Sequence, residues 1–451
     1  MINYHGASSE LPPDACKVAK PKPLPRSVWL LSGVSFFADV SSEMVYPVLP
    51  LFMISVLGSS KTQIGAMEGG AVLLVAMMSA FAGIRSDRKG QHGGRVAWIR
   101  WGYGLPVLGK AVIALSTVWP MVLGGRLLDR FGKGLRGAPR DALIVDAVSP
   151  EQRGRAFGLH RAFDTAGAIV GVLISAILLW WLTGTPQSNV SSEVLVNASE
   201  TPAWVYRFII GVGAALGLAS LALTFFLSES PDAMPKLLRG DTSQGLDVLA
   251  ASQNQGIGSS QLPASYWYVL AILVLFSLAN SSDTFLLLRA HDLGYSPWAV
   301  VMVYALYNCF YSLLSYPAGA LSDRFGRWRI ILSGWLIYAC VYAGFALLPV
   351  SQAWGMWPLM AIYGVYMALT DGVGKALIAD HAPSESRGKA MGIFYGLTGT
   401  TTFIASLVAG IIWDRFGVTP ALLLGCFFSI LAVLALIICR GRIERSNQTR
   451  K

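Results

Sequence analysis

The sequence predicts an all-α membrane protein in which twelve transmembrane helices form two pseudo-symmetric bundles of six. Its 451 residues are 54% hydrophobic and only 13% charged, which is too apolar for a soluble globule of this size and makes a lipid bilayer the natural solvent. Two short motifs also recur at corresponding places in the two halves of the chain. Long apolar stretches and an internal repeat are therefore the observations that predict the fold.

The apolar stretches have the length of membrane-spanning helices. A helix crosses the hydrocarbon of a bilayer with about 20 apolar residues, whereas a spanning strand needs only about 10 residues of alternating polarity. The stretches are longer than that and apolar on all sides, so helices are predicted and a barrel is disfavoured. Six stretches in each half start near Val28, Thr62, Val96, Trp119, Arg155, Trp204, Tyr266, Pro297, Arg329, Trp354, Gly388 and Val418.

The two repeated motifs keep one spacing along the chain. The first motif is Gly-x-x-x-Asp-Arg after the second span of each half, and the second is Ala-Leu-Ile-x-Asp followed by Arg-Gly. Asp87 and Asp323 lie 236 positions apart, and Arg153 and Arg387 lie 234 positions apart, so the halves are a duplication in register. The motif residues singled out are Gly83, Asp87, Arg88 and Arg153 in the first half and Gly319, Asp323, Arg324 and Arg387 in the second.

The distribution of lysine and arginine predicts the orientation. The loops after the second, fourth, eighth and tenth spans are rich in both residues, and such loops stay in the cytoplasm. We therefore expect both termini to be cytoplasmic and the protein to lie in a bacterial inner (plasma) membrane. The net charge of +10 then reflects topology and contact with anionic lipid, and nucleic-acid binding is not expected.

The polar segments divide the chain. Segment 1–26 is rich in proline and lacks the apolar core of a signal peptide, and the segment between the halves is rich in glycine, proline and serine, as in a flexible linker. Asn189 and Asn197 fit either glycosylation acceptors or an ordinary bacterial periplasmic loop. The predicted units are an N-terminal tail (1–26), a first bundle (27–227), a linker (228–264), a second bundle (265–440) and a C-terminal tail (441–451).

Twelve helices in two halves with Gly-x-x-x-Asp-Arg after the second helix of each half resemble the major facilitator superfamily over the whole chain. The fourth span also looks like the superfamily's Arg-x-x-x-Gly motif, beginning at Arg126, although Arg130 replaces its first glycine. The resemblance implies secondary active transport by alternating access around a central site, and no enzyme activity. Independently, the sequence has no Walker-type loop for nucleotide hydrolysis, so ion gradients are the expected source of energy.

In that superfamily the motif aspartate holds the cytoplasmic side shut in the outward-open state. The resemblance therefore implies that the motif residues of both halves are gate latches. Their expected partners are the helix starts near Gly388 and Arg155, with Arg153 and Arg387 nearby. An aspartate suits this role because a helix N-terminus carries partial positive charge, and the motif glycine lets helices approach closely. The alternative is a solvated turn with a helix cap.

The first span carries two acids on one face, Asp39 and Glu43, and the first span of the second half ends a similar sequence with Asp283. Ionisable residues within spans are costly and are functional by default. Burial favours the neutral form of a carboxylic acid, so Asp39, Glu43 and Glu68 are predicted to exchange protons during transport. The alternative is that they form structural ion pairs with the fourth span.

The fourth span is unusually basic. We expect Asp164 of the fifth span to pair with Arg136 and His160 to face Arg140. These groups could bind an anionic solute through charge-assisted hydrogen bonds or neutralise the acids of the first span. Aromatic residues in spans could line the cavity or only pack. The candidates for substrate binding or a charge network are Arg126, Arg130, Arg136, Arg140, His160, Asp164, Asp283, Tyr307, Tyr311, Tyr366 and the expected pair Asp371 and Lys375.

These patterns predict a proton-coupled transporter of a small polar, charged solute that acts as a monomer. A multidrug or metabolite efflux antiporter is the alternative, and the direction of transport stays open. A sensor that keeps the transporter fold would need a folded signalling domain, which neither the tail nor the linker resembles. The five cysteines indicate no disulfide framework and no metal site, since four lie in spans and Cys16 lies in the tail. No cofactor is expected.

Overall fold

The computed structural model describes residues 23–89, 94–149, 152–184, 201–227, 262–383 and 387–448, and within these ranges it gives the backbone alone for 83–89, 153–154, 387–389 and 440–448. Every regular element in the described ranges is helical, which confirms the predicted fold class. Asn189, Asn197, Cys16 and nearly all of the predicted linker lie outside the described residues.

The first half contains seven helices. Helices α1 and α2 are separated by a short break, and together they form one apolar segment of 30 residues. Proline lies at the start of α2 and of α5, where its missing N–H is not needed by the helix. The helices are α1 (Arg26–Val45), α2 (Leu49–Ser55), α3 (Lys61–Lys89), α4 (Arg95–Ala114), α5 (Trp119–Ala147), α6 (Arg153–Thr183) and α7 (Ala203–Thr224).

The second half repeats this plan. Gly326 and Gly417 have φ values of 90° and 89°, a left-handed conformation that glycine adopts without strain, and each ends an Asp-Arg-Phe-Gly sequence between two long helices. The elements are α9 (Ala264–Ser277), α10 (Thr284–Asp292), α11 (Pro297–Phe325), α12 (Arg327–Leu347), the 3₁₀ helix η6 (Val350–Gly355), α13 (Met356–His381), α14 (Arg387–Phe416) and α15 (Val418–Gln448). Helix α15 thus continues past residue 440.

The described helices make the predicted twelve passes when α1 is joined with α2 and α9 with α10. Eight passes are long and apolar enough to cross a membrane by length and composition. The other four are α4, α5, α13 and the pass broken between α9 and α10. The charged residues of α5 lie among α1, α3, α4 and α6 of the first half, and irregular or charged membrane segments are tolerated where protein or a cavity surrounds them.

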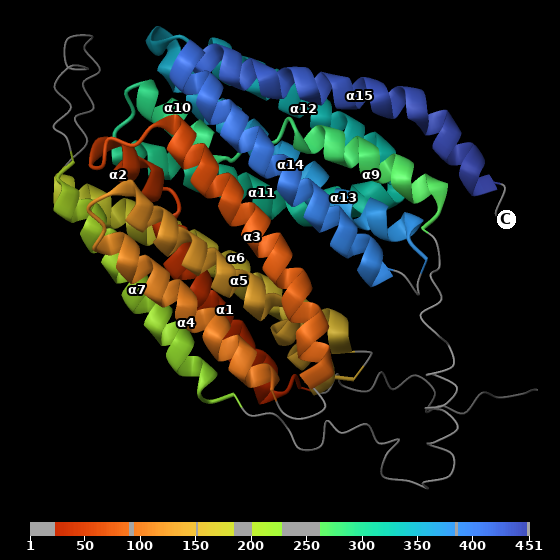
Figure 1. Cartoon of the computed structure of the whole chain (residues 1–451), viewed down its shortest axis with the longest axis horizontal. Helices are drawn as coiled ribbons and strands as arrows, with labels where there is room; N and C mark the ends of the chain where they lie inside the picture. The colour runs from red at the N-terminus through yellow and green to blue at the C-terminus, as the bar shows by residue number, and fades with distance from the viewer. Residues whose placement is uncertain are drawn as a thin grey trace, which may run out of the picture.

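Helices α1–α7 form one group and α9–α15 form the other (Figure 1). The groups meet along a seam made by α3 against α14 and by α6 against α11. Equivalent ion pairs join neighbouring helices in each group, Arg95 to Asp146 and Arg327 to Asp380. Because Asp146 and Asp380 belong to the second repeated motif, the duplication seen in the sequence is also present in the structure.

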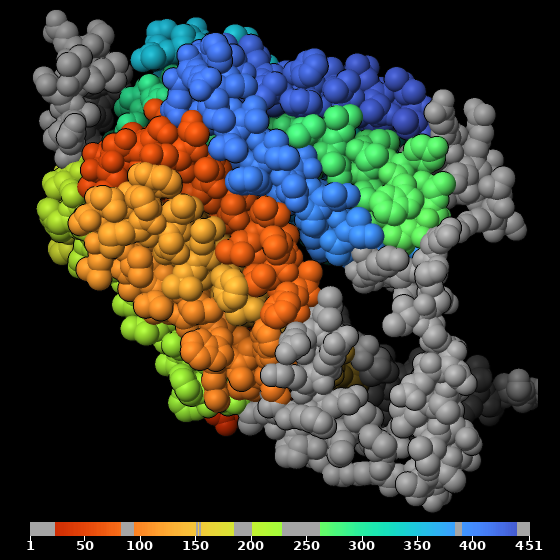
Figure 2. All heavy atoms as spheres, in the orientation of Figure 1, coloured from red at the N-terminus to blue at the C-terminus, as the bar shows by residue number. Residues whose placement is uncertain are grey.

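The seam differs at its two ends. We call the end at which α1 begins and α15 ends the termini end, and the opposite end the far end. Towards the far end, a methyl group added to Gly65, Gly69 or Gly410 would overlap the backbone of the opposite helix. Figure 2 shows α3, in orange, directly against α14, in blue. Glycine is needed here because the two backbones touch, which seals the seam at the far end.

Candidate functional site

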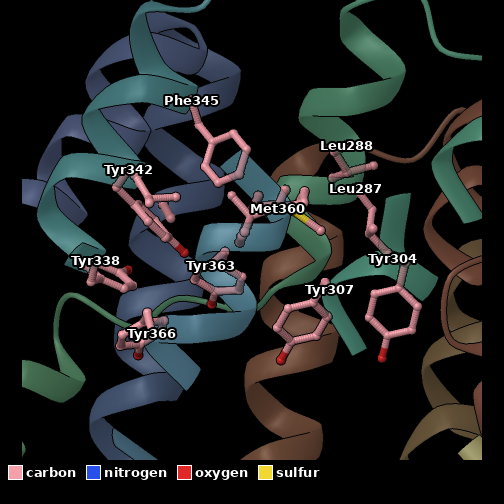
Figure 3. Packing of buried hydrophobic residues seen from close by; sticks show 14 of the residues in the cluster. Leu287, Leu288, Tyr304, Tyr307, Tyr338, Tyr342, Phe345, Met360, Tyr363 and Tyr366 are labelled. Carbon is pink, nitrogen blue, oxygen red and sulfur yellow. The ribbon is translucent and has the colours of Figure 1, made fainter. Parts of the chain in front are cut away.

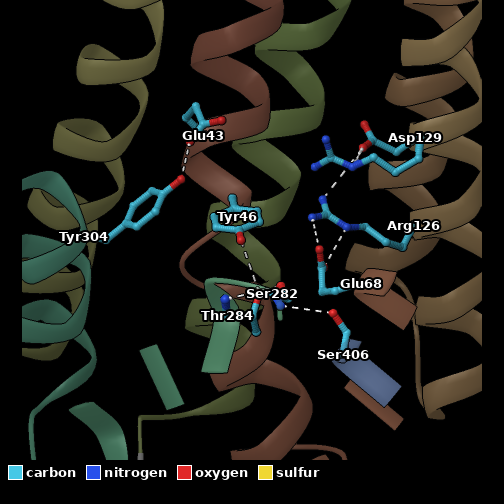
Figure 4. A network of polar contacts seen from close by, with 10 residues as sticks. Glu43, Tyr46, Glu68, Arg126, Asp129, Ser282, Thr284, Tyr304 and Ser406 are labelled. Atoms are coloured by element: carbon cyan, nitrogen blue, oxygen red, sulfur yellow. Dashed lines mark hydrogen bonds and ion pairs between the residues drawn. The ribbon is translucent and has the colours of Figure 1, made fainter. Parts of the chain in front are cut away.

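The acids of α1 face the seam. The hydroxyl of Tyr304, on α11 of the second half, donates a hydrogen bond to Glu43 Oε2 at 2.9 Å (Figure 4). Asp39 lies one turn earlier on α1 and is half-buried. Lys133 interacts electrostatically with both carboxylates, but no lysine or arginine nitrogen among the described residues lies within 4.0 Å of either one. Glu43 is therefore held by a phenol of the other half.

Glu68 is held differently. Arg126 of α5 donates from Nε to Oε1 at 2.9 Å and from Nη2 to Oε2 at 2.8 Å (Figure 4). Both side chains are buried, and a buried bidentate pair of this kind fixes both groups. The contacts of Glu68 therefore match the alternative that the sequence left open, in which this acid forms a structural ion pair with the fourth span.

Asp129 is the centre of a second ionic group in the first half. Its Oδ1 accepts from Lys110 Nζ at 3.1 Å, and its Oδ2 lies 3.3 Å from Arg130 Nε and 3.8 Å from Arg126 Nη1. The Arg130 contact is an ion pair without hydrogen-bond geometry. Lys110 also donates to Ser42 on α1. Sequence reasoning did not select Lys110, although it is buried and links three helices.

The ion pair expected between α5 and α6 does not form. Arg136 lies over the ring of Tyr103, 4.2 Å from its centroid, and Arg140 pairs with its neighbour Asp141 at 2.9 Å. His160 Nδ1 instead lies 3.4 Å from Oδ2 of Asp164, one turn along the same helix. The prediction that Asp164 pairs with Arg136 is therefore wrong, because Asp164 lies one turn from His160 on its own helix and contacts it instead. His160 does lie near enough to Arg140 for the two charges to interact, as expected.

Asp283 lies in the break between α9 and α10, and phenols surround it. Tyr363 donates to its Oδ1 at 2.6 Å and Tyr307 donates to its Oδ2 at 3.2 Å. Tyr366, which the sequence selected, packs against Tyr338 with ring centroids 4.8 Å apart, and among the described residues it does not hydrogen-bond to this carboxylate. The break in the helix therefore presents a carboxylate to the rings of α11 and α13.

These rings belong to a larger group, shown in part in Figure 3. Neighbouring rings touch, with centroids 5.3 Å apart between Tyr307 and Tyr363 and 4.0 Å apart between Tyr338 and Tyr342. We call this group the tyrosine cluster. It consists of Tyr304, Tyr307 and Tyr311 on α11, Tyr338 and Tyr342 on α12, and Tyr363 and Tyr366 on α13.

A cavity of about 280 Å³ lies between the halves towards the termini end. Tyr311 donates to Asp371 at 3.0 Å on its wall, and Lys375 pairs with the same carboxylate at 2.7 Å. The expected pairing of Asp371 with Lys375 is thereby confirmed. Arg161 of α6 is the residue that the first half contributes to the lining. The cavity reaches the last turns of α11, where Asp323 lies.

The residues predicted to form gate latches lie at the termini end. The Asp323 side chain is 73% exposed and lies 3.8 Å from Arg327, and Arg324 lies over the ring of Phe325. In the described part of the chain, no atom beyond the neighbouring backbone of α11 lies within 4 Å of a methyl group placed on Gly319. Gly83, Asp87 and Arg88 lie in the last turns of α3, and Arg153 and Arg387 begin α6 and α14; their side chains lie outside the described residues.

Asp414, at the end of α14, closes the far end and was not selected from the sequence. Its Oδ1 accepts from the backbone N–H of Lys61 at 3.0 Å. Its Oδ2 accepts from the backbone N–H and the hydroxyl of Thr62 at 2.8 and 2.6 Å. Lys61 also pairs with Asp292 of α10 at 3.8 Å. A carboxylate of the second half thus caps the first turn of a helix of the first half.

Two packed groups of membrane helices with a charged and aromatic site at their seam define an integral multi-pass membrane protein of the transporter class. The family model of the Major Facilitator Superfamily matches residues 31–399, and the chain belongs to this superfamily. It is a secondary transporter of small molecules and not an enzyme.

Relatives cover most of the chain. An uncharacterized MFS-type transporter of Methanocaldococcus jannaschii is 31% identical over 421 residues, which are 91% of this chain and 94% of the relative. The multidrug resistance protein MdtH of Cronobacter sakazakii is 25% identical over 354 residues, 77% of each chain.

Solved structures agree in fold. The nucleoside transporter NupG aligns with a TM-score of 0.67 and 15% identity, covering 92% of this chain and 99% of that one. A peptide transporter, POT, aligns with a TM-score of 0.69 and 15% identity, covering 94% and 96%. At these identities the structures show only that the fold is shared, and their substrates are not assigned to this chain.

Proposed function

We propose that the protein moves a small polar, charged solute by alternating access and couples this movement to protons. The observation that carries the proposal is the asymmetry of the seam. Helices α3 and α14 touch at the far end, whereas a cavity lies between the halves towards the termini end. A site that is sealed from one side and reachable from the other is what alternating access requires.

The same proposal assigns each end of the seam to one side of the membrane. The termini end would face the cytoplasm of a bacterium, because the basic loops lie there and such loops stay inside. The two moving units would be the bundles 27–227 and 265–440, joined by the linker 228–264, in a monomer in the inner membrane. The grouping of helices into two packed sets that meet at one seam supports this division.

Asp39 and Glu43 are proposed to carry the proton. Neither has a cationic nitrogen within 4.0 Å among the described residues, whereas Glu68 is locked in its bidentate pair with Arg126. Protonation of a carboxylate that no cation holds leaves no buried cation without its partner, whereas protonation of Glu68 would leave Arg126 unpaired. Within the predicted trio, the contacts therefore favour Asp39 and Glu43 over Glu68.

Proteoliposomes with an imposed pH gradient test this function. We expect the gradient to drive at least one solute from a panel of anions, cations and neutral compounds. Asp39→Asn and Glu43→Gln should each abolish the response to the gradient, and Asp39→Asn should leave solute exchange at equal pH within about threefold of the parent protein. Asp146→Asn, at a pair on the termini end, is the matched control. Unchanged gradient-driven transport in both carboxylate variants would refute the assignment.

The latch role proposed for the two motif aspartates fits the exposure of Asp323. Its side chain is 73% exposed and contacts only Arg327 among the described residues, as expected for a latch that is released while the cavity is reachable from the termini end. In the outward-open state the same aspartate would engage a helix start of the other half. Asp87, whose side chain lies outside the described residues, is proposed to act in the same way.

Efflux of drugs or metabolites in exchange for protons is the second candidate function. The tyrosine cluster favours it, because aromatic walls bind varied organic molecules, and one relative bears the name of a multidrug resistance protein. Expression in a drug-sensitive bacterial strain separates the two: efflux predicts lower drug accumulation in the cells, and an importer predicts no protection.

A further inference from the structure

If the protein works as proposed above, the charged side chains at the seam that lack an ion-pair partner indicate the class of its substrate. Two buried basic groups of the first half are already occupied. Arg126 is bound by Glu68 at 2.8 Å, and Lys110 is bound by Asp129 at 3.1 Å. Lys133 interacts with Asp39 and Glu43 but also with Arg130 and Arg136. An anionic solute that bound Arg126 or Lys110 would have to displace a buried carboxylate, which costs several kcal/mol for each broken pair.

The two acids nearest the second half, unlike these basic groups, are bound by phenols and not by an oppositely charged side chain. Asp283 accepts hydrogen bonds only from the phenols of Tyr363 and Tyr307, and Glu43 accepts one from Tyr304. No lysine or arginine nitrogen in the described part of the chain lies within 4.0 Å of Asp283 or Glu43. Phenols bring no positive charge to a carboxylate, so Asp283 has no cationic partner among the described residues and Glu43 has only the more distant Lys133 and Arg130. A cation would complement this pair of acids in its ionised form.

Aromatic rings form a continuous wall between these two carboxylates. The centroid distances are 5.3 Å from Tyr46 to Tyr304, 5.7 Å from Tyr304 to Tyr307 and 5.3 Å from Tyr307 to Tyr363. Tyr46 already has the guanidinium of Arg126 over its ring at 5.5 Å. A cation over the face of such a ring is attracted by its quadrupole, and several rings together recognise alkylammonium groups.

One hydroxyl of the tyrosine cluster is poorly bound. The Tyr342 hydroxyl is buried, in a residue only 1% exposed, and it lies near the hydroxyls of Tyr338, Ser281 and Tyr363 but forms no hydrogen bond of good geometry among the described residues. In Figure 3 its oxygen points towards Tyr363, whose hydroxyl is bound to Asp283. A buried hydroxyl left without a partner costs about 1–3 kcal/mol, so this oxygen is available to accept from a donor that enters the cluster.

We propose that this site binds organic cations, with the positive group between Glu43 and Asp283 and against the rings of Tyr304, Tyr307 and Tyr363. In the structure the phenols occupy the carboxylates. On binding, the cation replaces these phenols as the partner of the carboxylates, and an ammonium N–H can donate to the Tyr342 hydroxyl. A protonated amine and a quaternary cation share this chemistry, except that only the amine uses the Tyr342 oxygen.

Equilibrium binding to the purified full-length chain in detergent tests the proposal without any transport. Tetraphenylphosphonium and tetraphenylborate have the same shape and opposite charge, and benzyltrimethylammonium and benzylamine serve as smaller cations. We expect at least one cation to bind, and Asp283→Asn to weaken its binding at least tenfold, or about 1.4 kcal/mol. Asp146→Asn should leave the affinity unchanged, and the melting temperature of each variant reports its folding.

Substitutions of Tyr363 separate ring recognition from hydrogen bonding. Tyr363→Phe keeps the ring and should change cation affinity less than threefold, whereas Tyr363→Leu should weaken it at least tenfold. Three results would each overturn the proposal: no cation in the panel binds the folded protein, binding ignores Asp283→Asn, or tetraphenylborate binds more tightly than tetraphenylphosphonium.

The binding assay and the transport assay fail independently. If no cation binds while a pH gradient drives another solute in proteoliposomes, the substrate class is wrong and the transport function stands. If cations bind as expected but no solute responds to the gradient, proton-coupled transport is wrong and the cation site stands.

Discussion

Asp414 holds the far end of the seam closed through three hydrogen bonds to the first turn of α3. Asp414→Ala removes all three at once and also removes a negative charge from a helix N-terminus. Because α3 and α14 belong to opposite halves, the substitution destabilises the state in which the far end is sealed. In the state open at the far end, the same contact would already be broken.

The size of the effect follows from these contacts. Loss of a helix N-cap costs about 0.5–2 kcal/mol, and loss of a charge next to a helix N-terminus costs about 0.3–1 kcal/mol. Asp414 is exposed, so solvent and salt weaken the charge contribution. We expect a total of about 1–2 kcal/mol, which multiplies the ratio of far-end-open to far-end-closed molecules by about 5–30.

Labelling of a cysteine within the sealed seam measures this ratio. Ser406 is fully buried and lies against Gly65 across the seam, so Ser406→Cys, with the five native cysteines replaced by serine, reports opening at the far end. An impermeant maleimide added from that side labels it at a rate that follows the open population when opening is fast. Asp414→Ala should raise the rate about 5–30-fold, and Asp414→Asn, which keeps an acceptor oxygen, less than about threefold. An unchanged rate in Asp414→Ala would refute the capping role.

Three further perturbations test the other parts of the structure. Arg126→Met leaves Glu68 buried without its partner and should destabilise the protein by about 3–5 kcal/mol, which a lower melting temperature would show. Adding Glu68→Gln should restore most of the lost stability, and a double variant that shows no recovery would contradict the pairing. Gly69→Leu should prevent α3 from touching α14 and raise far-end maleimide labelling at least tenfold, whereas labelling at the parent rate would show that the contact is not needed for closure. Asp323→Asn should slow transport and raise severalfold the labelling of Ser315→Cys in the cavity from the termini end; unchanged labelling would count against the latch.

The fold was predictable because the signals that determine it are local in sequence. The length of each apolar stretch decides whether a helix can span the bilayer, and a spacing shared by two motifs identifies the duplication. The structure repeats that duplication in its contacts, since Arg95 pairs with Asp146 as Arg327 pairs with Asp380. Nothing in these signals depends on how the helices are rotated against one another.

Contacts within one helix were predictable for the same reason. Asp371 and Lys375 are four residues apart, a spacing that places both on one face of a helix, and they pair. The expected contact between Arg136 and Asp164 required the relative rotation of two helices, which spacing does not give. His160, four residues from Asp164, was the local alternative that the structure adopts.

The residues that sequence reasoning missed had weaker signals. Lys110 is a charge beyond the midpoint of α4, whose other charges, Arg95 and Arg100, lie in its first turns, and a charge within a span is an indication of function. Tyr363 was one aromatic residue among many, and only the fold brings it to Asp283. Asp414 begins an Asp-Arg-Phe-Gly sequence that also occurs at Asp323, so the recurrence could have directed attention to the far end.

Distances across both ends of the seam, measured on one protein, test alternating access most directly. Spin labels at Val118 and Trp354 report the far end, and labels at Phe226 and Phe325 report the termini end, all at exposed positions. Pulsed electron paramagnetic resonance in liposomes should show one pair lengthening as the other shortens when pH or a transported solute changes. Both pairs lengthening together, or neither pair responding to either change, would contradict alternating access in this protein.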